Sequence, residues 1–224
     1  MTTYDTILFD SDGILVHPPA YETQAGATQD AFREVGAKDV DSHHIDNIVN
    51  GTTVKALREI CDTYDIDIDI FWEARERYDE ESQFDKFKSG SRSRYSDVEA
   101  ISNLSQTCGV VSNNHHSTIE FVLEFFDLQP VFDIYYGREK TVESLDLKKP
   151  NTHYLDQALT ELGAESALYI GDSESDIVAA HRAGLDSAFV RRPHTTDIEL
   201  STIPTYEIND LYEVTKIAEG QACK

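Results

Sequence analysis

The residues with the clearest capacity for chemistry stand at the end of a short apolar run near the start of the chain. Residues 4–9 (YDTILF) are rich in residues that favour β-strands, and Asp10, Asp12 and Gly13 follow them. Aspartate is also common in solvated turns, so this pair alone does not establish a site. Two carboxylates at the end of a buried strand nevertheless need a cation or a proton nearby, because burial disfavours like charges.

The elements that must position these acids are the strands of a parallel sheet. After residue 95, expected helices at 97–106, 117–127, 151–162, 174–183 and 210–219 alternate with expected strands at 109–112, 132–136, 167–170 and 187–190 and near residue 206. This alternation predicts a doubly wound α/β fold, in which ligands bind at the carboxyl ends of the strands. The helix at 117–127 is expected to begin with a capping box formed by Ser117 and Glu120.

Polar groups fall at four of these expected ends. Each group alone has an ordinary explanation, such as a helix cap, a surface cation or acids favoured by a helix dipole. Together, at matching positions of the sheet, they predict one site. The four groups are Asp10 with Asp12, Ser112-Asn113-Asn114, the Lys148-Lys149-Pro150 loop, and the segment 171–176 (GDSESD).

The combined side chains suit a phosphoryl group held beside a metal ion. Carboxylates are ligands that Mg²⁺ prefers, and Asp10, Asp12, Asp172 and Asp176 would provide them. A hydroxyl, backbone N–H groups and a lysine can hold the phosphoryl group while its charge is neutralised. The sequence therefore predicts phosphoryl transfer through an aspartyl phosphate.

The same stretches carry a family resemblance. ILFDSDG, VVSNN, the KKP loop and YIGDSESDI, in this order, resemble the four motifs of the haloacid dehalogenase superfamily, and the resemblance covers essentially the whole chain. Residues 20–87 show only helical patterning between a His-Pro-Pro connector and the Ser/Gly-rich segment 88–94. These features imply a Rossmann-like core at 1–16 and 95–224 with an all-helical cap inserted at 17–94. Such a cap is typical of the subgroup that includes phosphoglycolate phosphatases and β-phosphoglucomutases.

The resemblance also implies a role for each motif residue. Asp10 would be the nucleophile, and Asp12 the general acid and then the general base. The phosphoryl group would be held by Ser112, Asn113 and Lys149. The expected Mg²⁺ ligands are Asp10, the backbone carbonyl of Asp12, and Asp172, with Asp176 binding the ion or its waters.

The acid at position 12 separates two kinds of chemistry. A phosphate ester leaves as an alkoxide that needs a proton, whereas a dehalogenase expels halide, which needs none. We therefore expect an Mg²⁺-dependent phosphatase that acts on a small phosphorylated metabolite, such as phosphoglycolate or a sugar phosphate. Two alternatives stay open: a β-phosphoglucomutase-like phosphomutase, and a phospho-switch or binding homologue without turnover.

Further polar residues have weaker claims to function. Lys55 ends the segment 50–55, where related caps present a specificity loop, and Arg58 follows it. Either residue could meet the substrate; a solvated helix face explains them equally well. A surface position is the expectation for His17, for the pair His115-His116 and for the pair Arg191-Arg192.

Charge and composition exclude several classes of partner. The formal net charge is −23, from 42 acidic against 19 basic residues, which argues against nucleic acid and anionic membranes. No apolar run approaches the roughly 20 residues of a membrane span, so we expect a cytoplasmic protein. Self-repulsion on this scale also suggests a salt-rich, halophilic cytoplasm. The three cysteines, Cys61, Cys108 and Cys223, lack metal-site spacing and are expected to be reduced thiols.

Overall fold

The chain forms two compact units in a computed structural model that describes residues 4–220; Cys223 lies outside this range. The first unit comprises the chain up to His17, Ser93–Arg138 and the chain from Lys148 onward. The second comprises Pro18–Arg92 and Glu139–Leu147. Within residues 4–220, no helix combines the length and the apolar character needed to cross a membrane.

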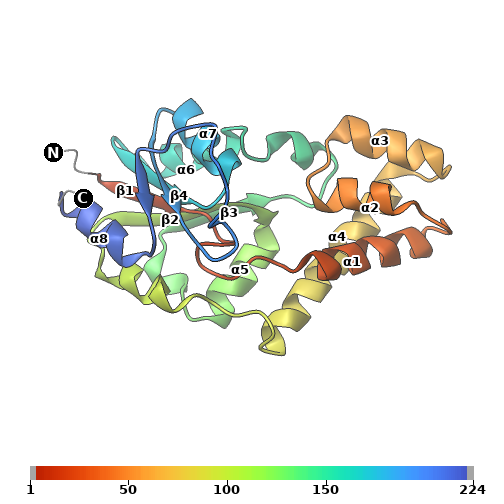
Figure 1. The fold of residues 1–224 in the computed structure, drawn as a ribbon, viewed down its shortest axis with the longest axis horizontal. Coiled ribbons are helices and arrows are strands. Elements are labelled where there is room, and N and C mark those ends of the chain that lie inside the picture. The colour runs from red at the N-terminus through yellow and green to blue at the C-terminus, as the bar shows by residue number, and fades with distance from the viewer. Residues whose placement is uncertain (1–3, 221–224) are drawn as a thin grey trace. The chain divides into compact units, whose positions relative to one another are not determined.

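A six-stranded sheet organises the first unit, and all its neighbouring strands are parallel (Figure 1). The strand order is β3-β2-β1-β4-β5-β6, so β1 lies between β2 and β4. The expected doubly wound parallel sheet is confirmed. The strands are β1 Thr6–Phe9, β2 Thr107–His115, β3 Ile134–Arg138, β4 Ala167–Gly171, β5 Asp186–Val190 and β6 Tyr206–Ile208.

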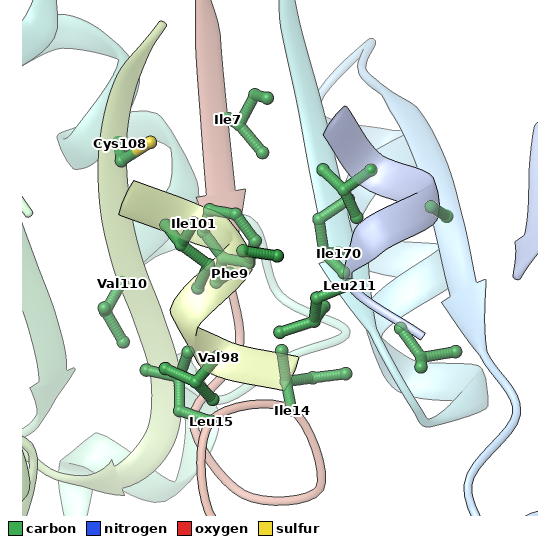
Figure 2. Close-up of a cluster of buried hydrophobic side chains, with 14 of the residues drawn as sticks. Ile7, Phe9, Ile14, Leu15, Val98, Ile101, Cys108, Val110, Ile170 and Leu211 are labelled. Carbon is green, nitrogen blue, oxygen red and sulfur yellow. The ribbon is translucent and has the colours of Figure 1, made fainter. Parts of the chain in front are cut away.

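Helices cover both faces of this sheet. The α-helices of the first unit are α5 (His116–Phe125), α6 (His153–Leu162), α7 (Glu174–Arg182) and α8 (Tyr212–Ala218), and its 3₁₀ helices are η1 (Ser96–Asn103) and η2 (Gln129–Val131). One face packs against η1, α5 and α8, and Figure 2 shows Ile7 and Phe9 of β1 on the same side as Val98 and Ile101 of η1. Complete burial of one such side chain stabilises the fold by about 1.5–3 kcal/mol.

The second unit is helical, as expected for residues 20–87. It contains α1 (Tyr21–Glu34), α2 (Ser42–Val49), α3 (Val54–Thr63), α4 (Ile68–Lys88) and the 3₁₀ helix η3 (Glu143–Leu147). Asp41, Thr53 and Asp67 cap the starts of α2, α3 and α4 by accepting backbone N–H groups. Phe32 and Phe71 pack at the centre of its apolar core, with ring centroids 4.2 Å apart. The segment Glu139–Leu147 joins this unit from a distant part of the sequence.

Three local predictions were wrong. The helix expected at 97–106 is the 3₁₀ helix η1, whose buried residues Asp97, Val98, Ala100 and Ile101 recur every three positions, as a 3₁₀ helix requires. The capping box at Ser117 does not form, because α5 starts one residue early and His115 occupies the N-cap position. His115 was expected on the surface, but it ends β2 and is fully buried.

Candidate active site

Asp10 directly follows the central strand β1 and is nearly buried. Its N–H donates to the carbonyl oxygen of Ile170 at 2.9 Å, which extends the pairing of β1 with β4 by one residue. Its carboxylate oxygen Oδ1 lies 3.0 Å from the Nζ atom of Lys149. Burial raises the pKa of Asp10 to about 7; three neighbouring aspartates act in the same direction, and the charge of Lys149 opposes them. The carboxylate therefore sits where its negative charge is costly without a cation.

Lys149 supplies positive charge at the centre of the site. Its Nζ atom lies 2.6 Å from Asp176 Oδ1, in addition to its pairing with Asp10, and it donates to the hydroxyl of Tyr169 at 2.5 Å and to the carbonyl of Val111 at 3.2 Å. Burial alone would lower the pKa of this lysine, but the two carboxylates outweigh burial and raise it. The ammonium group consequently stays charged while it is buried.

Asp176 is held in place by the start of α7. The side chain of Ser173 accepts the N–H of Asp176, and Asp176 Oδ2 in turn accepts the N–H of Ser173 at 3.0 Å, which forms a capping box. The same oxygen accepts the N–H of Asp172 at 3.2 Å. Because Oδ2 is used in this way, Oδ1 is the oxygen that faces Lys149. The close approach also needs Gly171, where a Cβ atom would overlap the Asp176 side chain.

Asp172 approaches the turn after Asp10 from the end of β4. Gly13 adopts φ +81°, and a Cβ atom at this position would overlap the Asp172 carboxylate. Asp172 Oδ2 lies 2.6 Å from Nε2 of His194. Burial raises the pKa of Asp172, whereas the hydrogen bond with His194 acts against the rise.

The acid cluster fits a divalent cation. Asp10, Asp172 and Asp176 each offer a carboxylate oxygen, and these atoms lie within 4.8 Å of one another. Oδ1 of Asp10 and Oδ1 of Asp176 are both buried, and both face the single ammonium group of Lys149. Three buried carboxylates around one ammonium leave excess negative charge, which a hard cation such as Mg²⁺ would balance with the oxygen ligands it prefers. The cluster does not include Asp12.

The end of β2 brings the predicted phosphoryl-binding residues to the same edge of the sheet. Ser112 is buried, and its hydroxyl accepts the N–H of Asn114 at 3.3 Å. The side chain of Asn113 accepts the N–H of Lys149 at 2.7 Å and donates to the carbonyl of Lys149 at 3.2 Å. Both ends of the Asn113 amide are thus engaged, and this residue fixes the backbone that carries Lys149. Asp12 Oδ2 accepts a hydrogen bond from Asn114 at 2.9 Å.

Sequence reasoning missed three residues at or beside this cluster. Tyr169 lies in the middle of the apolar strand β4, where only its hydroxyl distinguishes it from a core aromatic. His194 gave no sequence signal. Arg192 was expected in a surface pair, but it is buried. It forms a bidentate ion pair with Asp97, in which Nη1 and Nη2 donate to the two carboxylate oxygens at 2.8 and 3.1 Å. Charge alone suggested the surface, because the carboxylate that allows burial is distant in sequence.

Lys55 and Arg58 belong to the second unit. Both are exposed on α3, and Lys55 lies 3.8 Å from Glu59 of the next helical turn. Their part in substrate selection stays a prediction.

Comparison with a known family decides the classification. Residues 7–190 match the family model described as haloacid dehalogenase-like hydrolase. The chain belongs to this family. The motif resemblance is therefore confirmed over most of the sequence.

Individual relatives are more distant. The pyrophosphatase PpaX of Bacillus cereus is 32% identical over 98 residues, which are 43% of this chain and 44% of that protein. The chain thus spans less than half the length of this curated relative.

Solved structures resemble nearly the whole chain. A predicted phosphoglycolate phosphatase from Haemophilus somnus matches with a TM-score of 0.66 and 21% identity, over 97% of this chain and 99% of the other. CbbY from Rhodobacter sphaeroides, in complex with phosphate, matches with a TM-score of 0.68 and 17% identity, over 95% and 96% of the two chains. At these identities the likeness establishes the fold.

Proposed function

We propose that this haloacid dehalogenase-like hydrolase is an Mg²⁺-dependent phosphatase that cleaves a small phosphate monoester through an aspartyl phosphate on Asp10. The observation that carries the proposal is the position of Asp10: a nearly buried carboxylate at the end of the central strand, 3.0 Å from Lys149 and clustered with Asp172 and Asp176. Such a group is suited to attack phosphorus once positive charge has neutralised the phosphoryl oxygens.

The proposed reaction has two displacements. In the first, an oxygen of Asp10 forms a bond to phosphorus, the bond to the ester oxygen breaks, and Asp12 gives its proton to that oxygen. In the second, Asp12 takes a proton from water, the water oxygen bonds to phosphorus, and the bond to Asp10 breaks to release phosphate. Asp12 thus returns to its starting state.

The remaining residues bind and orient. Lys149 and the hydroxyl of Ser112 would contact the phosphoryl oxygens, and Asn113 holds the backbone of Lys149. Mg²⁺ bound by Asp10, Asp172 and Asp176 would neutralise phosphoryl charge as the nucleophile approaches. Tyr169 donates its hydroxyl proton to the carbonyl of Val111 at 2.7 Å and accepts from Lys149, so it helps to fix the direction of the ammonium group.

The decisive experiment compares the wild type with Asp10→Asn. The wild type should hydrolyse p-nitrophenyl phosphate with Mg²⁺ and lose this activity in EDTA. It should also trap a covalent phosphoryl group that hydroxylamine removes. Asp10→Asn should lose both properties while it keeps its far-UV circular dichroism. A variant that still turned over or still trapped phosphate would remove Asp10 from the role of nucleophile.

A phosphoanhydride substrate is the second candidate, because the matched curated relative is a pyrophosphatase. A panel of pyrophosphate, 2-phosphoglycolate and hexose phosphates separates the two classes by kcat/KM for phosphate release. The same panel tests the phosphomutase alternative, in which an isomerised sugar phosphate would appear without free phosphate. Preference for pyrophosphate over every monoester would replace the monoesterase proposal.

A further inference from the structure

The side chain of Asn114 contacts Asp12 from the neighbouring strand. Its Nδ2 atom donates to Asp12 Oδ2 at 2.9 Å. Its Oδ1 atom accepts the N–H of His115 at 2.8 Å. Because the oxygen of the amide faces an N–H group, the nitrogen must be the end that faces the carboxylate.

The local backbone of β2 explains why this side chain faces Asp12. The pairing of β2 with β3 shifts register between Val111 and His115, and Asn114 lies inside that irregular stretch. Such irregularities re-aim side chains at the ends of strands. The N–H of Asn114 donates to the Ser112 hydroxyl, which ties the same stretch to a second predicted site residue.

We propose that Asn114 is the positioning residue for Asp12. An amide N–H can donate to Oδ2 whether Asp12 is ionised or protonated, so this contact persists through both displacements. With Oδ2 held as an acceptor, the exchanged proton resides on Oδ1, and the plane of the carboxyl group is fixed. Asn114 thereby selects the oxygen that protonates the leaving group and later receives the proton of water.

This inference depends on the proposed function, but it also predicts how the loss of activity should vary with the leaving group. General acid catalysis contributes most when the leaving oxygen is strongly basic, and little when the leaving group is stable as an anion. Removal of Asn114 should therefore harm alkyl phosphates far more than p-nitrophenyl phosphate. A residue that served only the fold, or only the phosphoryl group, would affect both kinds of substrate equally.

The test measures kcat/KM for a series of aryl and alkyl phosphates in wild type, Asn114→Ala, Asp12→Asn and the double variant. For Asn114→Ala, kcat/KM should fall about 10- to 100-fold on alkyl phosphates and less than about 3-fold on p-nitrophenyl phosphate. The larger loss is part of the roughly 10²- to 10⁴-fold rate enhancement that general acid catalysis supplies. In the Asp12→Asn background, the same substitution should cost almost nothing, because its effect acts through Asp12.

The control is Asn209→Ala, which removes another amide that donates to a carboxylate, that of Glu213, at an exposed position. It should leave all rates unchanged. Should Asn114→Ala fail to fold, Asn114→Ser, which preserves a small polar side chain, takes its place. Equal losses on all substrates, or additive losses in the double variant, would overturn the inference about Asn114 while Asp12 keeps its role. If the loss of kcat/KM in Asp12→Asn were the same for every leaving group, Asp12 would not be the general acid. Both the proposed function of Asp12 and the inference about Asn114 would then be rejected.

Discussion

At the scale of single residues, the ionisation of Asp10 should make the stability of the protein depend on pH. In the metal-free protein its pKa is raised from 3.8 to about 7, chiefly by burial. The folded state therefore binds more protons than the unfolded state between these values, and stability must fall as pH rises through that window. Each unit of pKa difference corresponds to about 1.4 kcal/mol.

We therefore expect the free energy of unfolding of the metal-free protein to decrease between about pH 4 and pH 7 by an amount on the order of a few kcal/mol. Asp10→Asn should show a shallower decrease, because the amide cannot ionise; Asp172, whose pKa is also raised, would retain part of it. Urea denaturation in EDTA across this range provides the measurement. Added Mg²⁺ should flatten the wild-type profile, and an identical slope in the two proteins would contradict the assignment.

The sequence could predict which residues form the candidate site where a side chain able to bind metal or phosphate falls near the expected end of a strand. Asp10, Lys149 and Asp172 follow expected strands or stand in a short loop, and Asp176 lies in the first turn of an expected helix. The structure brings all four together. Tyr169 and His194 could not be predicted in this way. Their side chains matter because of what the fold places beside them, and neither residue type nor local spacing carries that information.

At the scale of elements, the turn after β1 depends on the absence of a side chain at Gly13. A methyl group there would overlap Asp172 and would also force an alanine to φ +81°. Gly13→Ala should lower the melting temperature and abolish hydrolysis, since the clash displaces a predicted metal ligand. Gly36→Ala is the matched control: Gly36 adopts φ +87°, but a Cβ atom there meets nothing within 4 Å.

The control should lose only the cost of the left-handed backbone, about 1–2 kcal/mol, and keep its activity. Thermal unfolding and a phosphatase assay on both variants make the comparison. Equal losses of stability with activity intact in both would show that the contact at Gly13 is unimportant.

The turn is also held by Arg192, from the segment that follows β5. Its guanidinium donates to the carbonyl oxygens of Gly13 and Ile14, each at 3.1 Å, and pairs with Asp97. It also lies 3.9 Å from the centre of the Tyr95 ring. A single buried cation thus joins η1, the turn after β1 and the end of β5.

Arg192→Met should destabilise the protein by about 3–5 kcal/mol, because it leaves the buried Asp97 without its partner. Arg33→Met is the control; its ion pair with Asp30 is exposed on α1, and the loss of this pair should cost no more than about 1 kcal/mol. Denaturant titration measures both values. Similar losses in the two variants would mean that burial adds nothing to the role of Arg192.

Most elements could be predicted because their patterns are local. Apolar runs marked β1 and β4, and helical periodicity marked α1 to α4. The capping box at Ser117 and the helix at 97–106 were predicted from local sequence alone. The structure starts α5 at His116 and buries residues of η1 at intervals of three positions. The segment Glu139–Leu147 belongs to the helical unit although it is far from residues 18–92 in the sequence, so no local sequence pattern could indicate this.

At the scale of the whole molecule, the net charge of −23 should make stability depend on salt. Repulsion between surface carboxylates is screened as the Debye length falls to about 3 Å at 1 M salt. The melting temperature should therefore rise between 0.1 and 2 M KCl, as measured by circular dichroism with the Mg²⁺ concentration fixed. An unchanged melting temperature and activity across this range would reject the halophilic hypothesis.

The strand order has a further consequence for how the protein is made. Thr6 of β1 pairs with Thr107 on one side and Ala167 on the other, so β1 leaves the ribosome before either neighbour and receives the second only after Ala167 has been translated. Until then the nascent segment YDTILF presents unpaired backbone and apolar side chains, which favours aggregation. Shortened chains that stop before β4 should therefore accumulate as insoluble, inactive material, however intact their first half.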